Sequence, residues 1–332
     1  MLDVAALAGV GLATVSRVVN GKTGVSPATA ARVQAAIDRL DYRHNVNAAT
    51  LRRANPKTAT IGLVLEDVAN PFMSALHRAV EDYARARGVL VFAGSCDEDA
   101  DRERELISEF RSRRVDGIIV VPAGPDHSYL LAEVRHGTAL VFVDRPPRFL
   151  DADTVTADDL GGARAAVEHL GRHGHRRIGF LGADVSITTA DARLRGYTEG
   201  LAALGVEPDP AIVRTGLASI EDAEEAAAAI LRDHDPPTAL LSAQNYFTVG
   251  AVKALRAVGR QREIAVVGYD DFLLADMLEP ALTVIAHDPV EIGRAAAELL
   301  FRRLDGASPP REHVVLPTRL VERGSGEIRV RR

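Results

Sequence analysis

Short apolar runs alternate with amphipathic stretches over most of the chain, and this alternation restricts the possible folds more than any other feature. From Thr60 onwards the runs are TIGLVLE, VLVFAGS, DGIIVVP, ALVFVD, RRIGFLG, TALLSA and IAVVGYD. Strands that read as continuous apolar runs between helices are typical of parallel sheets covered on both faces. The pattern predicts an α/β body of two lobes with parallel sheets, and the chain should first change lobe near residues 155–158.

The first forty residues have a different pattern, which predicts three short helices. The segment DVAALAGV should place Val4, Leu7 and Ala8 inward, and a glycine turn leads from it into LATVSRVV. In the third segment, Ser26 is a favourable N-cap and Pro27 suits the first helical position. Three helices with a glycine turn between the first two are typical of a helix-turn-helix unit, whose second helix enters the DNA major groove. An ordinary small helical bundle is the alternative.

The charge distribution favours the DNA interpretation. The net charge of −6 combines a basic start with an acidic remainder, because eight basic and three acidic residues lie up to Lys57. That segment carries +5 and the rest of the chain −11. A basic head can bind a polyanion while an acidic body is repelled from it.

Other functional classes find less support in the sequence. No apolar run reaches the roughly 18 residues of a membrane helix, no signal peptide precedes Asp3, and the single Cys96 suits a reducing cytoplasm. No nucleophile elbow or phosphate loop indicates an enzyme, and no cofactor is expected. The histidines of HLGRHGH lack regular spacing and lack a cysteine or carboxylate set, so no metal site is predicted. The charge-dense DEDADRERELISEFRSRR should form a solvated helix.

The head also resembles a known family. The stretch DVAALAGVGLATVSRVVNGKTGVSPATAARVQAAIDRLDYRHN is similar to the head of LacI/GalR bacterial transcription regulators, in register over some forty positions. The resemblance implies base contacts from Leu12, Ala13 and Arg17. It also places Thr14, Ser16 and Asn20 near phosphates or base edges. An arginine at position 17 suits a guanine edge, because its two N–H groups can bond O6 and N7.

Residues 46–54, VNAATLRRA, correspond to the hinge helix of this family. In the family, two such helices insert paired leucines into the minor groove, a known means of kinking DNA. Leu51 holds the leucine position, and Asn45 and Ala48 also match. A plain linker is the alternative interpretation.

From Thr60 the chain resembles the periplasmic-binding-protein-like core of the same family, in which the chain passes between the lobes three times. The expected domains are a helix-turn-helix domain (1–45), a hinge and linker (46–57), an effector-binding and dimerisation domain (58–325) and a tail (326–332). Lobe 1 should cover about 58–156 and 288–320, and lobe 2 about 157–287.

Ligands of open α/β sheets bind at the carboxyl ends of the strands. The strand ends, together with the family pattern for Arg193, predict an effector site with an apolar wall and several polar groups; its residues are Phe72, Met73, Asp144, Arg145, Arg193, Gln244, Asn245 and Asp270. Such a cleft suits a sugar or sugar derivative, and its two arginines leave room for an acid or a phosphorylated sugar. Ala218 stands where the family often has a stacking aromatic ring. Either the ligand is larger than a monosaccharide, or Tyr246 and Phe247 replace that ring.

These features predict a DNA-binding regulator, a repressor that grips a pseudo-palindromic operator as a homodimer and responds to a small molecule, expected to be a carbohydrate. The closing GSGEIRVRR is too short for the helical zipper of tetrameric relatives. The protein should be cytoplasmic, without a membrane partner. The alternative function is a solute-binding protein for transport, which shares the fold of the body.

Overall fold

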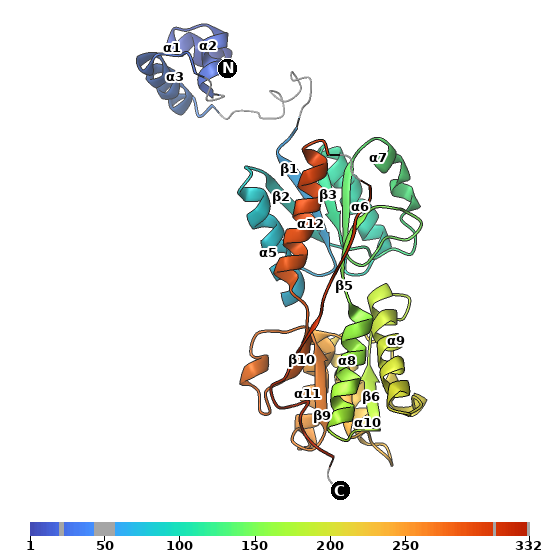
Figure 1. Ribbon diagram of the computed structural model, residues 1–332. Helices are drawn as coiled ribbons and strands as arrows, with labels where there is room; N and C mark the ends of the chain where they lie inside the picture. The colour runs from blue at the N-terminus through green and yellow to red at the C-terminus, as the bar shows by residue number, and fades with distance from the viewer. Residues whose placement is uncertain (20–22, 43–56, 308–309, 331–332) are drawn as a thin grey trace. The chain divides into compact units, whose positions relative to one another are not determined.

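The computed structural model describes residues 1–19, 23–42, 57–307 and 310–330 (Figure 1). The chain divides into two compact units, Met1–Thr58 and Ala59–Arg332. Among these residues, the first unit holds three helices, and the second holds two six-stranded sheets with helices on their faces. The fold class expected from the sequence is thereby confirmed.

The described part of the first unit contains three helices: α1 (Leu2–Ala8), α2 (Leu12–Val19) and α3 (Pro27–Arg39). The chain turns by 101° between α1 and α2, within the range of helix-turn-helix units. Gly9 makes this turn possible, because it ends α1 in the left-handed region at φ 62°. At the start of α3 the Ser26 hydroxyl accepts a hydrogen bond from the Thr29 amide, as its N-cap position predicts.

The three helices share a small apolar core. Its buried members are Val4, Ala5, Ala8, Val15, Val33 and Ala36. The expectation that Leu7 points inward is wrong, since Leu7 is 46% exposed. The seven-residue α1 instead turns Val4, Ala5 and Ala8 toward its neighbours, and position 7 falls outside that narrow stripe.

The first lobe of the body is built on an all-parallel sheet in the order β11-β5-β4-β3-β1-β2. Its strands are β1 (Thr60–Leu65), β2 (Leu90–Ser95), β3 (Gly117–Val120), β4 (Ala139–Asp144), β5 (Asp153–Ala157) and β11 (His313–Leu316). One face packs on α5 (Pro71–Arg85) and α12 (Pro289–Leu304), and the other on α6 (Ala100–Ser112) and α7 (Leu131–Arg135). Both faces are therefore buried, as the apolar runs predict.

The second lobe repeats this plan in the order β12-β10-β9-β8-β6-β7, with only β12 antiparallel among the described strands. Its strands are β6 (Ile178–Leu181), β7 (Val213–Arg214), β8 (Ala239–Ser242), β9 (Ala265–Tyr269), β10 (Thr283–Ala286) and β12 (Arg319–Val321). One face is covered by α8 (Asp159–Arg172) and α9 (Thr188–Ala203), the other by α10 (Ile220–Leu231) and α11 (Asn245–Ala257). Three single-turn helices complete the body: η1 (Ser128–Leu130), η2 (Pro210–Ile212) and η3 (Ala275–Met277).

The described chain passes between the lobes three times, and Figure 1 shows the connections after β5 and β10 and before β12. It leaves the first sheet after β5, returns with α12, and leaves again after β11 to add β12 to the second sheet. The last passage comes just before the limit of about residue 320 expected for the first lobe. Because the carboxyl ends of both parallel sheets meet at these passages, side chains from both lobes converge there.

Among the described residues, no single helix has the length and apolar character to cross a membrane; only the bent pair of α1 and α2, taken together, meets that test, by length and composition alone.

Candidate functional site

The helix α2 presents the residues expected to contact DNA. Val15 is fully buried and anchors α2 against its neighbours, while Leu12 is 42% exposed. Ala13 and Arg17 are exposed, and Thr14 and Ser16 are partly so. The other residues expected at the DNA lie outside the described part of the chain; they are Asn20, Asn45, Ala48 and Leu51. The apolar inner face of this two-turn helix packs on its neighbours, which leaves the mixed outer face available to contact DNA.

A cavity of about 520 Å³ opens between the two lobes of the body. Seventeen residues line it: Glu66, Asp67, Asp97, Glu98, Arg145, Ala183, Asp184, Ile187, Thr189, Ala190, Arg193, Gly216, Leu217, Ala218, Ala243, Gln244 and Tyr246. Residues 66 and 67 follow β1, residue 145 follows β4 and residue 244 follows β8. The cavity therefore lies at the strand ends, where open α/β sheets bind ligands. We refer to it as the interlobe cleft.

The structure brings some of the predicted effector residues to the cleft and places others behind its wall. Arg145, Arg193 and Gln244 line it. Phe72 and Met73 are instead buried in the core of the first lobe. The remaining three, Asp144, Asn245 and Asp270, are not among the lining residues and bond to other parts of the wall, so their contact with a ligand stays a prediction.

Arg145 is tied to the first lobe by several acceptors. Its Nη1 donates to the Glu98 carboxylate at 2.7 Å and to the Pro122 carbonyl at 3.1 Å, while its Nη2 also bonds Glu98. Asp144 lies 3.4 Å from its Nε. Burial opposes the charge of this guanidinium, but the bonds to Glu98 and the nearby carboxylates raise the pKa of Arg145 above its ordinary value.

Arg193 is fixed in the second lobe in a similar way. Its Nε donates to Asp159 at 2.6 Å and its Nη1 to the Ala243 carbonyl at 2.7 Å. The guanidinium carbon lies 4.3 Å from the centre of the Tyr269 ring, a cation–π contact. Asp159 was not among the residues predicted from the sequence. Its position in the first turn of α8, directly after the passage from the first lobe, could have indicated it.

A buried ion pair lies where the chain passes from β10 back to α12. The His287 Nδ1 is 2.9 Å from the Asp270 carboxylate, and its Nε2 is 3.4 Å from Asp159. Burial alone would lower the pKa of this histidine, but the two carboxylates outweigh it and raise the pKa of His287 to about 9. His287 is therefore a cation at neutral pH, and it neutralises Asp270 from behind the cleft.

Two hydrogen bonds join the lobes along the wall of the cleft. The Asn245 Nδ2 donates to the Asn70 side-chain oxygen at 2.9 Å, and the Tyr246 hydroxyl donates to Asp67 at 3.2 Å. Of the two aromatic rings proposed to replace a stacking residue, only Tyr246 lines the cleft. Phe247 is 1% exposed and belongs to the core of the second lobe, so its suggested contact with the ligand is wrong.

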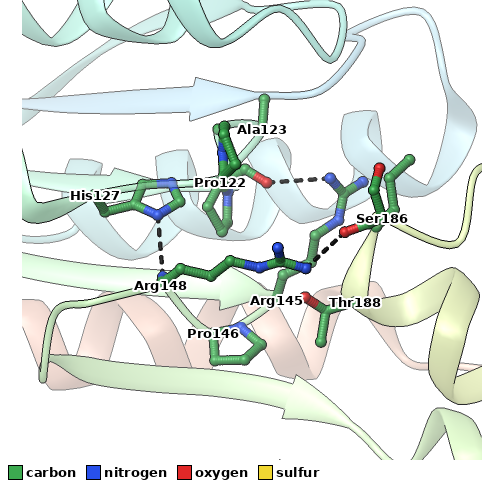
Figure 2. Close-up of a pocket in the computed structure, with 11 residues that line it drawn as sticks. Pro122, Ala123, His127, Arg145, Pro146, Arg148, Ser186 and Thr188 are labelled. Carbon is green, nitrogen blue, oxygen red and sulfur yellow. Dashed lines mark hydrogen bonds between the residues drawn. The ribbon is translucent and has the colours of Figure 1, made fainter.

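A smaller pocket of about 190 Å³ adjoins the cleft and shares Arg145 and Ile187 with it. In Figure 2 its walls come from both lobes, and the Arg148 guanidinium reaches across to the Ser186 carbonyl at 2.7 Å. On the first-lobe side, the His127 Nδ1 accepts a hydrogen bond from the Arg148 amide. The pocket therefore adds further polar groups next to those of the cleft.

The charge-dense segment around α6 is not wholly solvated, which corrects the expectation from the sequence. Glu98 bonds Arg145 in the cleft, and Glu103 is 1% exposed. The Glu103 carboxylate accepts bonds from the Ala123 amide at 2.6 Å and the Tyr129 hydroxyl at 2.7 Å. Charge density alone did not reveal that these two side chains point inward. The position of Glu98 shortly after β2 could have indicated it.

The statement that no carboxylates join the histidines of HLGRHGH is also wrong. Glu327 lies 2.7 Å from the His169 Nε2, and Glu322 lies 3.6 Å from its Nδ1. One ligand atom from each of the three side chains lies within 4.8 Å of the others, so a carboxylate set does join this histidine. Glu327 also accepts a bond from the Thr283 hydroxyl, so this cluster fastens the end of the chain to the second lobe.

Comparison with known proteins gives one family for both units. Residues 1–45 match the model of bacterial regulatory proteins of the lacI family, and residues 167–326 match a periplasmic binding protein-like domain. The chain is 31% identical to the transcriptional regulator DegA of Bacillus subtilis, over 97% of this chain and 96% of DegA. Among solved structures, the CelR–cellobiose complex is 31% identical, with a TM-score of 0.73 over 97% of this chain and 98% of that one. The lac repressor dimer bound to operator is 27% identical, with a TM-score of 0.85 over 98% of each chain.

Proposed function

The chain belongs to the LacI family of DNA-binding transcriptional regulators, and on that premise we propose that it is a repressor which binds a pseudo-palindromic operator as a homodimer and is controlled by a carbohydrate in the interlobe cleft. A protein that acts on the chromosome works in the cytoplasm, and we place it there. The observation that carries the proposal is the combination of an exposed α2 face in one unit with a polar cleft of about 520 Å³ in the other.

The DNA side of the proposal rests on α2. Leu12, Ala13 and Arg17 are exposed on a helix whose other face is packed on α1 and α3. We propose that these three side chains contact bases and that Thr14 and Ser16 lie toward the phosphate backbone of DNA. This arrangement fits the way a recognition helix enters the major groove. Asn20, Asn45, Ala48 and Leu51 complete the proposed DNA contacts. Two heads of a dimer would read two half-sites, because protein symmetry sets operator symmetry.

The ligand side rests on the chemistry of the cleft. A relative of known structure holds cellobiose, and the cleft of this chain offers carboxylates, two guanidiniums and the Gln244 amide to hydroxyl groups. Its volume lies in the range of ligand pockets of about 300–1,000 Å³. Ala218 lines the cleft without a ring, which leaves width for a ligand larger than a monosaccharide.

A carbohydrate can control DNA binding only if it prefers one arrangement of the lobes over another. The bonds from Asn245 to Asn70 and from Tyr246 to Asp67 hold the lobes together beside the cleft. A ligand between the lobes would change these contacts and, through the dimer, the separation of the two heads. We propose that the ligand is an inducer, which releases the operator.

Selection of binding sites from random double-stranded DNA with the full chain tests the proposal. The expected result is a pseudo-palindromic consensus bound by a dimer, with a salt dependence that reflects phosphate contacts. Failure to enrich any sequence, combined with tight binding of a sugar, would instead favour a solute-binding protein.

A further inference from the structure

The first lobe turns an acidic wall toward the interlobe cleft. Four of its carboxylates follow the ends of β1 and β2, and a fifth comes from the second lobe; they are Glu66, Asp67, Asp97, Glu98 and Asp184. The cleft is lined by only two arginines among the described residues, Arg145 and Arg193. The wall therefore carries more negative than positive charge.

Most donor atoms of the two arginines of this wall, and the Tyr246 hydroxyl, already bond to the protein. Arg145 bonds Glu98 and the Pro122 carbonyl, and Arg193 bonds Asp159 and the Ala243 carbonyl. The Tyr246 hydroxyl donates to Asp67. Beside the remaining guanidinium N–H groups, the Gln244 amide and the Thr189 hydroxyl, the cleft offers a ligand five carboxylates, which accept hydrogen bonds and donate none when ionised.

Glu66 is the carboxylate with the least internal compensation. Within the described chain it accepts no hydrogen bond, and its closest cation is the Arg145 Nη2 at 3.7 Å, which is itself bonded to Glu98. The Glu66 side chain is only 17% exposed, at the cleft surface. Burial and the neighbouring Glu98 raise the pKa of Glu66 to about 7. A carboxylate in such surroundings is stabilised by a proton or by a cation brought to it.

We propose that the effector is a carbohydrate with a protonated amine, and that this amine lies against the Glu66 carboxylate. The inference rests on the proposed carbohydrate function of the cleft and narrows it to amino sugars. An ammonium group supplies three donors and no acceptor, which complements an acceptor-rich wall. A sugar acid or sugar phosphate would add negative charge to a wall that already has five carboxylates, so the proposal excludes these two classes of ligand.

Sugars that differ only in one group distinguish the amino-sugar proposal from the broader proposal of a carbohydrate effector. Glucose, galactose and the β-1,4-linked disaccharide of glucose are each compared with the analogue in which an amine replaces the 2-hydroxyl, and with the N-acetylated form of that amine. Glucose 6-phosphate and gluconate serve as anionic probes. Binding to the full chain is followed by thermal unfolding and titration calorimetry. We expect one amine to bind at least about tenfold more tightly than both its neutral counterparts, as a hydrogen bond between charged groups provides.

Glu66→Gln keeps the shape of the side chain and removes its charge. We expect this variant to bind the amine and the N-acetylated sugar within about threefold of each other, while its melting temperature without ligand does not fall. Glu105→Gln is the control, because Glu105 is exposed on α6 away from the cleft lining. It should retain the full preference for the amine.

The outcomes distinguish the two proposals. Equal or tighter binding of a neutral sugar, or tightest binding of an anionic probe, overturns the amino-sugar inference and leaves a carbohydrate effector in place. An unchanged preference in Glu66→Gln overturns the role of Glu66. If no sugar of the set binds, the result contradicts both the proposed carbohydrate effector and the amino-sugar inference.

Discussion

His287 and its two aspartates show how single residues set the charge of the wall. One ring nitrogen faces Asp270 at 2.9 Å and the other faces Asp159 at 3.4 Å. Sequence analysis selected Asp270 because it follows a strand, and this reasoning placed it correctly at the strand end. It did not identify His287, because a histidine after an apolar run carries no signal until the fold brings two carboxylates to it.

The raised pKa of His287 predicts a pH dependence of stability. Since its pKa in the folded protein is about 9, against about 6.5 in an unfolded chain, the stabilisation is complete below pH 6.5 and is lost as the pH rises toward 9. The contribution is roughly 3 kcal/mol. Urea unfolding of the wild type and of His287→Gln at several pH values measures it. The two free energies of unfolding should converge between pH 6.5 and 9, and parallel curves would contradict the assignment.

Arg17 carries the most specific prediction for DNA. Arg17→Ala should lose discrimination at one base pair of each half-site, at a cost of roughly 1–3 kcal/mol per contact. Arg32→Ala is the control, because Arg32 is exposed on α3 rather than on α2. It should weaken binding to all sequences about equally. Binding-site selection with both variants distinguishes a base contact from a general loss of affinity. An unchanged consensus for Arg17→Ala would disprove the base contact.

At the scale of elements, the helices of the body lie close together in pairs. On α12, a Cβ at Gly293 would lie 2.6 Å from the Leu76 carbonyl oxygen of α5. On α11, a Cβ at Gly250 would lie 2.5 Å from the Ile220 oxygen of α10. The alternation of apolar runs with amphipathic stretches predicts helices between the strands, and α11 and α12 are two of them. The glycines that set the distance between partners could not be recognised, because a sequence does not show which helices touch.

Gly293→Ala tests this close approach. The added methyl must displace backbone of α5, and overpacking of this kind costs about 1–3 kcal/mol. Glu298→Ala, at an exposed position of the same helix, should change stability by only a few tenths of a kcal/mol. Chemical denaturation of both variants gives the comparison. Equal stability of Gly293→Ala and the wild type would show that the two helices separate without cost.

At the scale of the whole molecule, the chain combines a basic unit with an acidic one. The part up to Lys57 carries +5 and the remainder −11, so electrostatic attraction to DNA is confined to the head. The charge division follows from composition and the two lobes follow from periodicity, whereas the three passages between the lobes were expected only from the resemblance to the family. Composition and periodicity involve residues that are close together in the chain, so both can be recognised from the sequence alone.

The details of the cleft depend on contacts between distant residues. Arg145 meets Glu98 across 47 positions, and Asn245 meets Asn70 across 175. Strand-end reasoning found Arg145 and Gln244 in the lining, and the family pattern added Arg193. Strand-end reasoning also selected Phe72 and Met73, which pack into the core. Position at a strand end shows that a residue is near the cleft, but not which way its side chain turns.

In the proposed mechanism the cleft and the head are coupled, so that a ligand in one changes binding by the other. The affinity of the full chain for its selected operator, measured with and without a saturating carbohydrate that raises the melting temperature, tests this coupling. We expect the carbohydrate to weaken operator binding at least about tenfold, within the usual range of allosteric coupling of about 1–3 kcal/mol. An operator affinity that stays the same while the carbohydrate is bound would contradict it.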